Sequence, residues 1–141
     1  MIRFKDGEFD GYIEILGKDH RGFTRHIIIM IIECKFEKFS KEYSESDKIR
    51  KQIEKHLNVI KRNIVPWLNF LYKSDPPVIS YLLLANRKIS SDVEHVLREM
   101  ESTCGNNMNI HIGYISGNPL RKIITEYGEN VKDDILDLIF Q

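Results

Sequence analysis

Apolar residues gather in runs along the first quarter of the chain, and polar segments that contain glycine separate the runs. Residues 9–16 and 23–36 are rich in β-favouring side chains and flank the loop 17–22, a pattern that predicts a β-hairpin. The second segment contains the unbroken apolar run 27–32, which is too β-branched for a surface helix. We therefore predict that it is a central strand buried on both faces.

The apolar spacing changes after residue 44. Ser44 and Asp47 suit the start of a helix, and apolar side chains then recur three or four residues apart. They are Ile49, Ile53, Leu57, Ile60 and Ile64. This spacing predicts a long amphipathic helix. Pro66 should end or kink it, with about two further helical turns continuing to residue 71.

The second half of the chain again alternates strand and helix. Residues 78–85 and 109–116 predict two further buried strands, and Ser91 with Glu94 forms a capping-box pattern for a helix between them. Residues 117–119 predict a turn, and the apolar positions of 131–139 predict a short C-terminal helix. This order predicts an α/β fold, with a mixed central sheet, parallel crossovers and helices on both faces.

The composition fits a single domain. The 141 residues are 42% hydrophobic, enough for a substantial core without disulfides or structural metals. Because 21 basic residues balance 21 acidic ones, the net charge is zero, and an anionic partner would have to be recognised by a local patch.

Cysteine usage and the termini favour a soluble cytoplasmic protein. Cys34 and Cys104 are the only cysteines and predict no disulfide framework, which suits a reducing intracellular setting. The first ten residues do not resemble a signal peptide, and the longest apolar run is far shorter than the ~20 residues of a membrane span. We therefore expect no membrane partner.

An acid and a lysine stand at the end of the second predicted strand. Glu33 and Lys35 are two residues apart, so their side chains should emerge on one face of the sheet. If the hairpin loop is centred near residues 21–22, Asp10 lies opposite Glu33 with Cβ atoms about 5 Å apart. A loop centred on residues 19–20 would instead pair Asp10 with Ile29.

Two adjacent carboxylates favour a bound Mg²⁺ or Mn²⁺ ion, because hard oxygen ligands suit these cations. Lys35 would then orient the attacking water or neutralise charge on a phosphodiester. In the ordinary alternative, Glu33 and Lys35 form a strand-end ion pair, and Asp10 is the turn residue of the dipeptide Asp10-Gly11. Cys34 alternates to the opposite face, where we expect it to pack as an apolar residue. The chain has no serine-nucleophile motif and no nucleotide-binding glycine motif, so no nucleotide cofactor is expected.

At these positions the sequence resembles the PD-(D/E)xK nuclease superfamily, which includes Mrr-like, RecB-like and Holliday-junction-resolvase nucleases. The resemblance covers residues 8–116 and rests on Asp10 in Glu8-Phe9-Asp10-Gly11, on Glu33-Cys34-Lys35, and on the helix-strand-helix-strand order that follows. Gln52, in the helix after the lysine, corresponds to a glutamine of the RecB-like branch. Phe9 replaces the family's proline, and His56 stands where the RecB-like branch usually has a tyrosine.

The resemblance implies a restriction-endonuclease-like fold and a Mg²⁺- or Mn²⁺-dependent DNA endonuclease. It implies Asp10 and Glu33 as metal ligands and Asp10, Glu33, Lys35 and Gln52 as catalytic residues. Only about eight residues precede Asp10, so the chain lacks most of the family's usual N-terminal helix. A catalytically inactive subunit that binds DNA or a protein partner is therefore the alternative, and an unrelated α/β interaction module is a third possibility.

Basic residues gather in the predicted helix 48–62, whereas the C-terminal segment is acidic. We expect Lys38, Lys48, Lys51 and Lys55 to contact nucleic-acid phosphates. The alternative is a solvated helix face opposite the isoleucine stripe. An enzyme that cuts both strands of a duplex would work as a homodimer or with a partner subunit.

Overall fold

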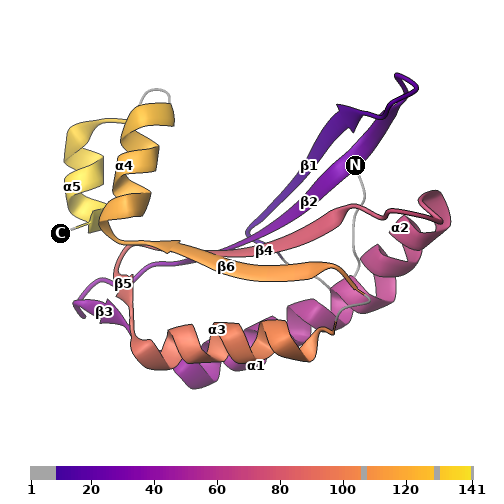
Figure 1. Cartoon of the computed structure of the whole chain (residues 1–141). Helices are drawn as coiled ribbons and strands as arrows, with labels where there is room; N and C mark the ends of the chain where they lie inside the picture. Colours follow the sequence, from indigo (N-terminus) through magenta and orange to yellow (C-terminus); the bar gives the residue numbers. More distant parts are fainter. Residues whose placement is uncertain (1–8, 106–107, 129–130, 141) are drawn as a thin grey trace.

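The computed structural model describes residues 9–105, 108–128 and 131–140, and a four-stranded mixed sheet lies at the centre of its α/β fold (Figure 1). The strand order is β1-β2-β4-β6. The strands are β1 (Gly11–Lys18), β2 (Thr24–Lys35), β4 (Val78–Ala85) and β6 (Ile110–Ser116). β1 pairs antiparallel with β2, while β2, β4 and β6 are parallel, as the alternation of apolar runs and helical segments predicts.

Helices make the two parallel crossovers. α1 (Ser46–Val59), the π-helical turn η1 (Ile60–Ile64) and α2 (Val65–Leu71) connect β2 to β4, and α3 (Ser91–Thr103) lies between β4 and β6. The wide turn closes with a bond from the Val65 N–H to the Ile60 carbonyl, immediately before Pro66. Pro66 has no N–H to donate, so the helix changes geometry there, and two turns follow as predicted.

The remaining elements flank the carboxyl ends of the parallel strands. β3 (Glu42–Tyr43) and β5 (Lys88–Ile89) form a small parallel sheet, and α4 (Asn118–Tyr127) and α5 (Asp133–Phe140) end the chain. The prediction of a turn at residues 117–119 is wrong, because the helix α4 begins at Asn118 and carries a proline in its first turn. Proline is favoured at that position, since the first N–H groups of a helix need no intrahelical partner.

The start of α3 also differs from the prediction. The N-cap is Ser90 rather than Ser91, and the Ser90 hydroxyl accepts a hydrogen bond from the Val93 N–H at 3.2 Å. Ser90 has the extended backbone that an N-cap requires, whereas Ser91 already lies within the helix.

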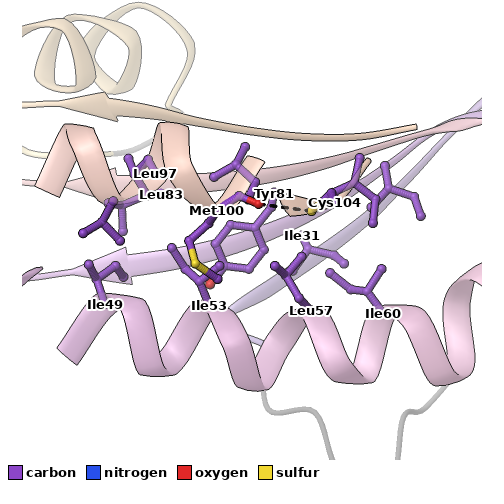
Figure 2. Close-up of a cluster of buried hydrophobic side chains, with 14 of the residues drawn as sticks. Ile31, Ile49, Ile53, Leu57, Ile60, Tyr81, Leu83, Leu97, Met100 and Cys104 are labelled. Atoms are coloured by element: carbon purple, nitrogen blue, oxygen red, sulfur yellow. Dashed lines mark hydrogen bonds between the residues drawn. The ribbon is translucent and has the colours of Figure 1, made fainter. Parts of the chain in front are cut away.

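The core lies between the sheet and the helix pair α1 and α3, which cover one face of the sheet (Figure 1). Ile31, Tyr81 and Leu83 project from the sheet toward the isoleucine stripe of α1, which includes Ile49 and Ile53 (Figure 2). All five side chains are completely buried. We call this covered side the inner face of the sheet.

The opposite, outer face is much less covered. Ile29 and Ile31 on the inner face are fully buried, while Ile28 on the outer face is only half-buried. On β1, Ile13 and Ile15 are 44% and 37% exposed. The prediction that helices cover both faces is therefore wrong in part, since α4 and α5 lie over only one end of the outer face (Figure 1).

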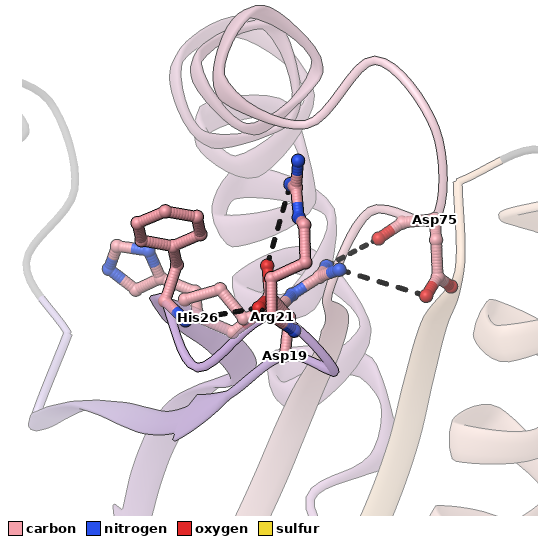
Figure 3. A network of polar contacts seen from close by, with 6 residues as sticks. Asp19, Arg21, His26 and Asp75 are labelled. Atoms are coloured by element: carbon pink, nitrogen blue, oxygen red, sulfur yellow. Dashed lines mark hydrogen bonds and ion pairs between the residues drawn. The ribbon is translucent and has the colours of Figure 1, made fainter.

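The closed end of the β1–β2 hairpin is held against the loop that precedes β4 (Figure 3). The Arg25 guanidinium donates to the Asp75 carbonyl at 2.5 Å and lies 4.7 Å from the Tyr72 ring centroid. The Asp19 carboxylate accepts from the N–H groups of Arg21 and Phe23, which shapes the hairpin loop. These contacts lock the loop that determines the register of the two strands.

Candidate active site

The hairpin register brings Asp10 to Glu33. Gly11 pairs with Ile32, so the residue before β1 lies opposite Glu33, as a loop centred near residues 21–22 predicts. The register shifts by one residue between Ile15 and Leu16, a β-bulge that gives β2 the extra residue Ile27. The irregularity therefore lies near the hairpin loop, and the pairing from Gly11 to Ile15, which includes the end beside Asp10, is regular.

Asp10 is tied directly to the end of β2. Its Oδ2 accepts a hydrogen bond from the Cys34 N–H at 2.8 Å. Gly11 supports this close approach, because a Cβ at that position would lie 3.1 Å from the Ile32 Cβ. Glu8, which precedes Asp10 in the family resemblance, lies outside the described residues.

Glu33 is the central group of the site. It projects from β2 onto the inner face and is only 3% exposed. Its Oε1 is 3.1 Å from the Lys35 Nζ and accepts from the Gln52 amide at 2.6 Å. Its Oε2 is buried with no hydrogen-bond partner among the described residues. One carboxylate oxygen is thus held by two side chains, and the other is buried without a hydrogen bond to any described residue.

The electrostatics of Glu33 follow from this setting. Burial raises the pKa of the Glu33 carboxyl above its ordinary value, because the charged form loses water. The Lys35 ammonium lowers this pKa in part, and the nearby Asp10 carboxylate raises it again. A cation bound beside Glu33 would offset the repulsion that its carboxylate experiences from Asp10.

The donor set fits a divalent metal ion of the Mg²⁺ type. Buried, unpartnered Glu33 Oε2 and the carboxylate of Asp10 are hard oxygen donors on neighbouring strands. Within residues 9–105, 108–128 and 131–140, no group of three or more His, Cys, Asp or Glu side chains could hold a metal ion. Mg²⁺ commonly takes one or two protein carboxylates and completes its shell with water and substrate oxygens.

No protein-family model matches the chain, and neither a curated protein nor a solved structure resembles it significantly. The four residues that the sequence nominates as catalytic, Asp10, Glu33, Lys35 and Gln52, do lie together at the carboxyl end of β2.

Sequence reasoning missed two residues beside Glu33. Buried His56 lies with its Nδ1 4.0 Å from Glu33 Oε2, and the same nitrogen is 2.7 Å from the hydroxyl of fully buried Tyr81. His56 is four residues after Gln52, so the helical repeat alone places both on one side of α1. Tyr81 had no such signal, because its contact depends on how α1 packs against β4.

The basic residues of α1 are divided between two sides of the helix. Lys48 and Lys55 are about one turn before and after Gln52, so they share the flank that faces the site, and Lys51 is adjacent. All three are exposed, and Lys48 is 3.9 Å from Glu45. Arg50 points elsewhere, since it forms two hydrogen bonds to Glu99 of α3 at 2.9 and 3.0 Å.

Lys38 lies on the exposed segment that follows β2, with its Nζ 5.4 Å from the Phe39 ring centroid.

The histidines of the hairpin are not near the site. His26 is seven residues before Glu33 on the same strand, which corresponds to about 23 Å. His20 lies in the closed hairpin loop beyond His26, at the end of the strand opposite to the site. Cys34 is exposed on the outer face rather than packed.

The raised pKa of Glu33 predicts a specific pH dependence of stability. Above the ordinary pKa of 4.5, the unfolded protein releases the Glu33 proton before the folded protein does. The folded state then binds more protons, so the free energy of unfolding should fall as pH rises from 4.5 through the higher folded pKa. Glu33→Gln should lack this component, as measured by urea unfolding between pH 4 and 8. Parallel curves for the two proteins would contradict the assignment.

Proposed function

We propose that this chain is a Mg²⁺- or Mn²⁺-dependent endonuclease domain that hydrolyses DNA phosphodiester bonds. The observation that carries the proposal is the buried Oε2 of Glu33, which has no hydrogen-bond partner in the described part of the chain. Asp10 lies opposite Glu33, and Lys35 and Gln52 bind its other carboxylate oxygen. An isolated strand-end ion pair would leave no reason to bury a carboxylate with an unpaired oxygen.

Each side chain has a role in this mechanism. Asp10 and Glu33 would hold the metal ion, which would polarise the phosphodiester and lower the pKa of a coordinated water. Gln52 holds Glu33 Oε1 and so leaves Oε2 as the oxygen that would bind the ion. Lys35 is half-buried, and its ammonium is positioned to orient the attacking water and offset the negative charge that grows on the phosphate.

The proposal includes a restriction-endonuclease-like arrangement of the sheet. The antiparallel β1–β2 pair, the helical crossover and the parallel strand β4 agree with the order of elements on which the family resemblance rests. Ligands of α/β sheets generally bind beyond the carboxyl ends of parallel strands, and Glu33 and Lys35 are at that end of β2.

The nucleic acid would approach along one flank of α1. Lys48, Lys51 and Lys55 are exposed on the Gln52 side of this helix, and Lys38 follows β2 directly. These four ammonium groups would contact backbone phosphates, which fixes the position of the duplex without reading its sequence. A homodimer, or a complex with a partner subunit, would supply the second site that cutting both strands requires.

The direct test is cleavage by the purified chain. Supercoiled, linear and branched DNA are incubated with the protein and Mg²⁺ or Mn²⁺, and parallel reactions contain excess EDTA. We expect cleavage with either metal and none with EDTA. A folded protein that cuts nothing with either metal, or that cuts equally in EDTA, would contradict the proposal.

A second candidate is a catalytically inactive subunit of the same fold that binds DNA or a partner protein. The burial of Glu33 favours the inactive subunit, since this side chain is only 3% exposed and already binds Lys35 and Gln52. Metal binding separates the two functions: DNA binding without any Mn²⁺ binding would identify the inactive subunit.

A further inference from the structure

The His56–Tyr81 pair lies directly behind the oxygen that the proposed function assigns to the metal. His56 Nδ1 is 2.7 Å from the Tyr81 hydroxyl and 4.0 Å from Glu33 Oε2. A hydrogen bond needs about 2.7–3.2 Å, so Nδ1 is bonded to Tyr81 and not to Glu33. A shift of roughly 1 Å would reverse that choice.

Packing holds the imidazole in this position. Tyr81 projects from β4 and is fully buried, and His56 is 2% exposed on α1. The Phe9 ring meets the His56 ring edge to face, with ring centroids 5.1 Å apart. The imidazole therefore has little room to turn while the Tyr81 hydroxyl is present.

We propose that Tyr81 is a positioning residue that keeps His56 away from Glu33, so that Oε2 stays available to a divalent metal ion. This inference rests on the proposed function. Glu33 Oε1 is taken by Lys35 and Gln52, so Oε2 is the only remaining ligand atom of Glu33. Without the Tyr81 hydroxyl, His56 moves to Oε2, forms a hydrogen bond with it and competes with the metal.

The test is Mn²⁺ binding, measured from the electron paramagnetic resonance signal of free Mn²⁺ and independent of DNA cleavage. Tyr81→Phe removes only the hydroxyl and should raise the Mn²⁺ dissociation constant about tenfold, the lower end of the effect of residues that orient metal ligands. Adding His56→Leu to Tyr81→Phe removes the competing imidazole. The double variant should then return to within about twofold of the wild-type affinity.

Recovery in the double variant distinguishes positioning from a general structural effect, because a second core substitution in a merely loosened site would weaken binding further. The matched control is Tyr72→Phe. Tyr72 forms the same contact with His26, 2.7 Å from hydroxyl to Nδ1, at the far end of β2. This variant should lose a similar hydrogen bond and keep wild-type Mn²⁺ affinity.

The outcomes separate the inference from the function on which it rests. If wild-type protein binds no Mn²⁺, the proposed metal site is wrong and the inference falls with it. If wild type binds Mn²⁺ and Glu33→Gln does not, but Tyr81→Phe binds as wild type does, only the inference is wrong. The same holds if the double variant binds no better than Tyr81→Phe. Should the double variant not fold, Tyr81→Phe with His56→Met replaces it.

Discussion

Replacing Glu33 by Gln is expected to reduce metal-dependent DNA cleavage by about 10³-fold or more. Gln keeps the size of the side chain and an oxygen for Gln52 or Lys35, but it removes the negative charge that would hold the proposed metal ion together with Asp10. It also removes a carboxylate whose burial raises its pKa, so the variant should remain folded. The measurement is the single-turnover cleavage rate at saturating Mn²⁺.

Glu42→Gln is the matched control. Glu42 is exposed on β3, so the same chemical change there should leave the cleavage rate unchanged.

Lys35→Met tests the other half of the site and should lower the cleavage rate by about 10²–10³-fold, the range found when one charge-stabilising donor is lost. Equal rates for wild type, Glu33→Gln and Lys35→Met would show that the nuclease activity, if present, belongs to a different site.

Replacing Ile53 by Ala is expected to lower the free energy of unfolding by about 2–5 kcal/mol. Ile53 is fully buried where α1 meets the inner face of the sheet. It lies between Ile49 and Leu57 along the apolar stripe of α1 (Figure 2). Removing three carbons there leaves a cavity that neighbouring side chains fill only in part. Ile53 also follows Gln52, so the same packing holds that amide against Glu33. Urea unfolding followed by circular dichroism gives the free energy.

Ile13→Ala is the comparison on the outer face. The Ile13 side chain is 44% exposed, so its truncation should cost less than about 1 kcal/mol. A loss as large as that of Ile53→Ala would contradict the open outer face and show that another surface covers β1 in solution. The pair of variants therefore tests the one-sided core directly.

The pattern of apolar residues predicts most of the secondary structure. The hairpin, the long helix with its change at Pro66, and the strands 78–85 and 109–116 are all confirmed. They are predictable because each apolar run has a clear period and a clear break. α4 was missed because Asn118 and Pro119 look like turn residues, although the same pair suits the first turn of a helix.

Local chemistry also accounts for part of the candidate site. Glu33 and Lys35 lie on one side of β2 because side chains alternate along a strand, and that needs no tertiary information. Whether Asp10 reaches them was open, since the choice depended on where the hairpin loop is centred. The β-bulge at Ile27 and the contacts of the loop decide it, and the pairing of Gly11 with Ile32 is the result.

The sequence by itself therefore determined the elements, the inward-facing stripes and the charged end of β2, because these depend on neighbours a few residues apart. Only the tertiary structure decided which surfaces meet. It buried Glu33 beneath α1, bonded Gln52 to its Oε1, and left the outer face open. It also placed His56 4.0 Å from Glu33 Oε2, bonded to Tyr81. The physical reason is that packing of α1 against β2 and β4 joins residues 19–25 positions apart, and no short-range period encodes those contacts.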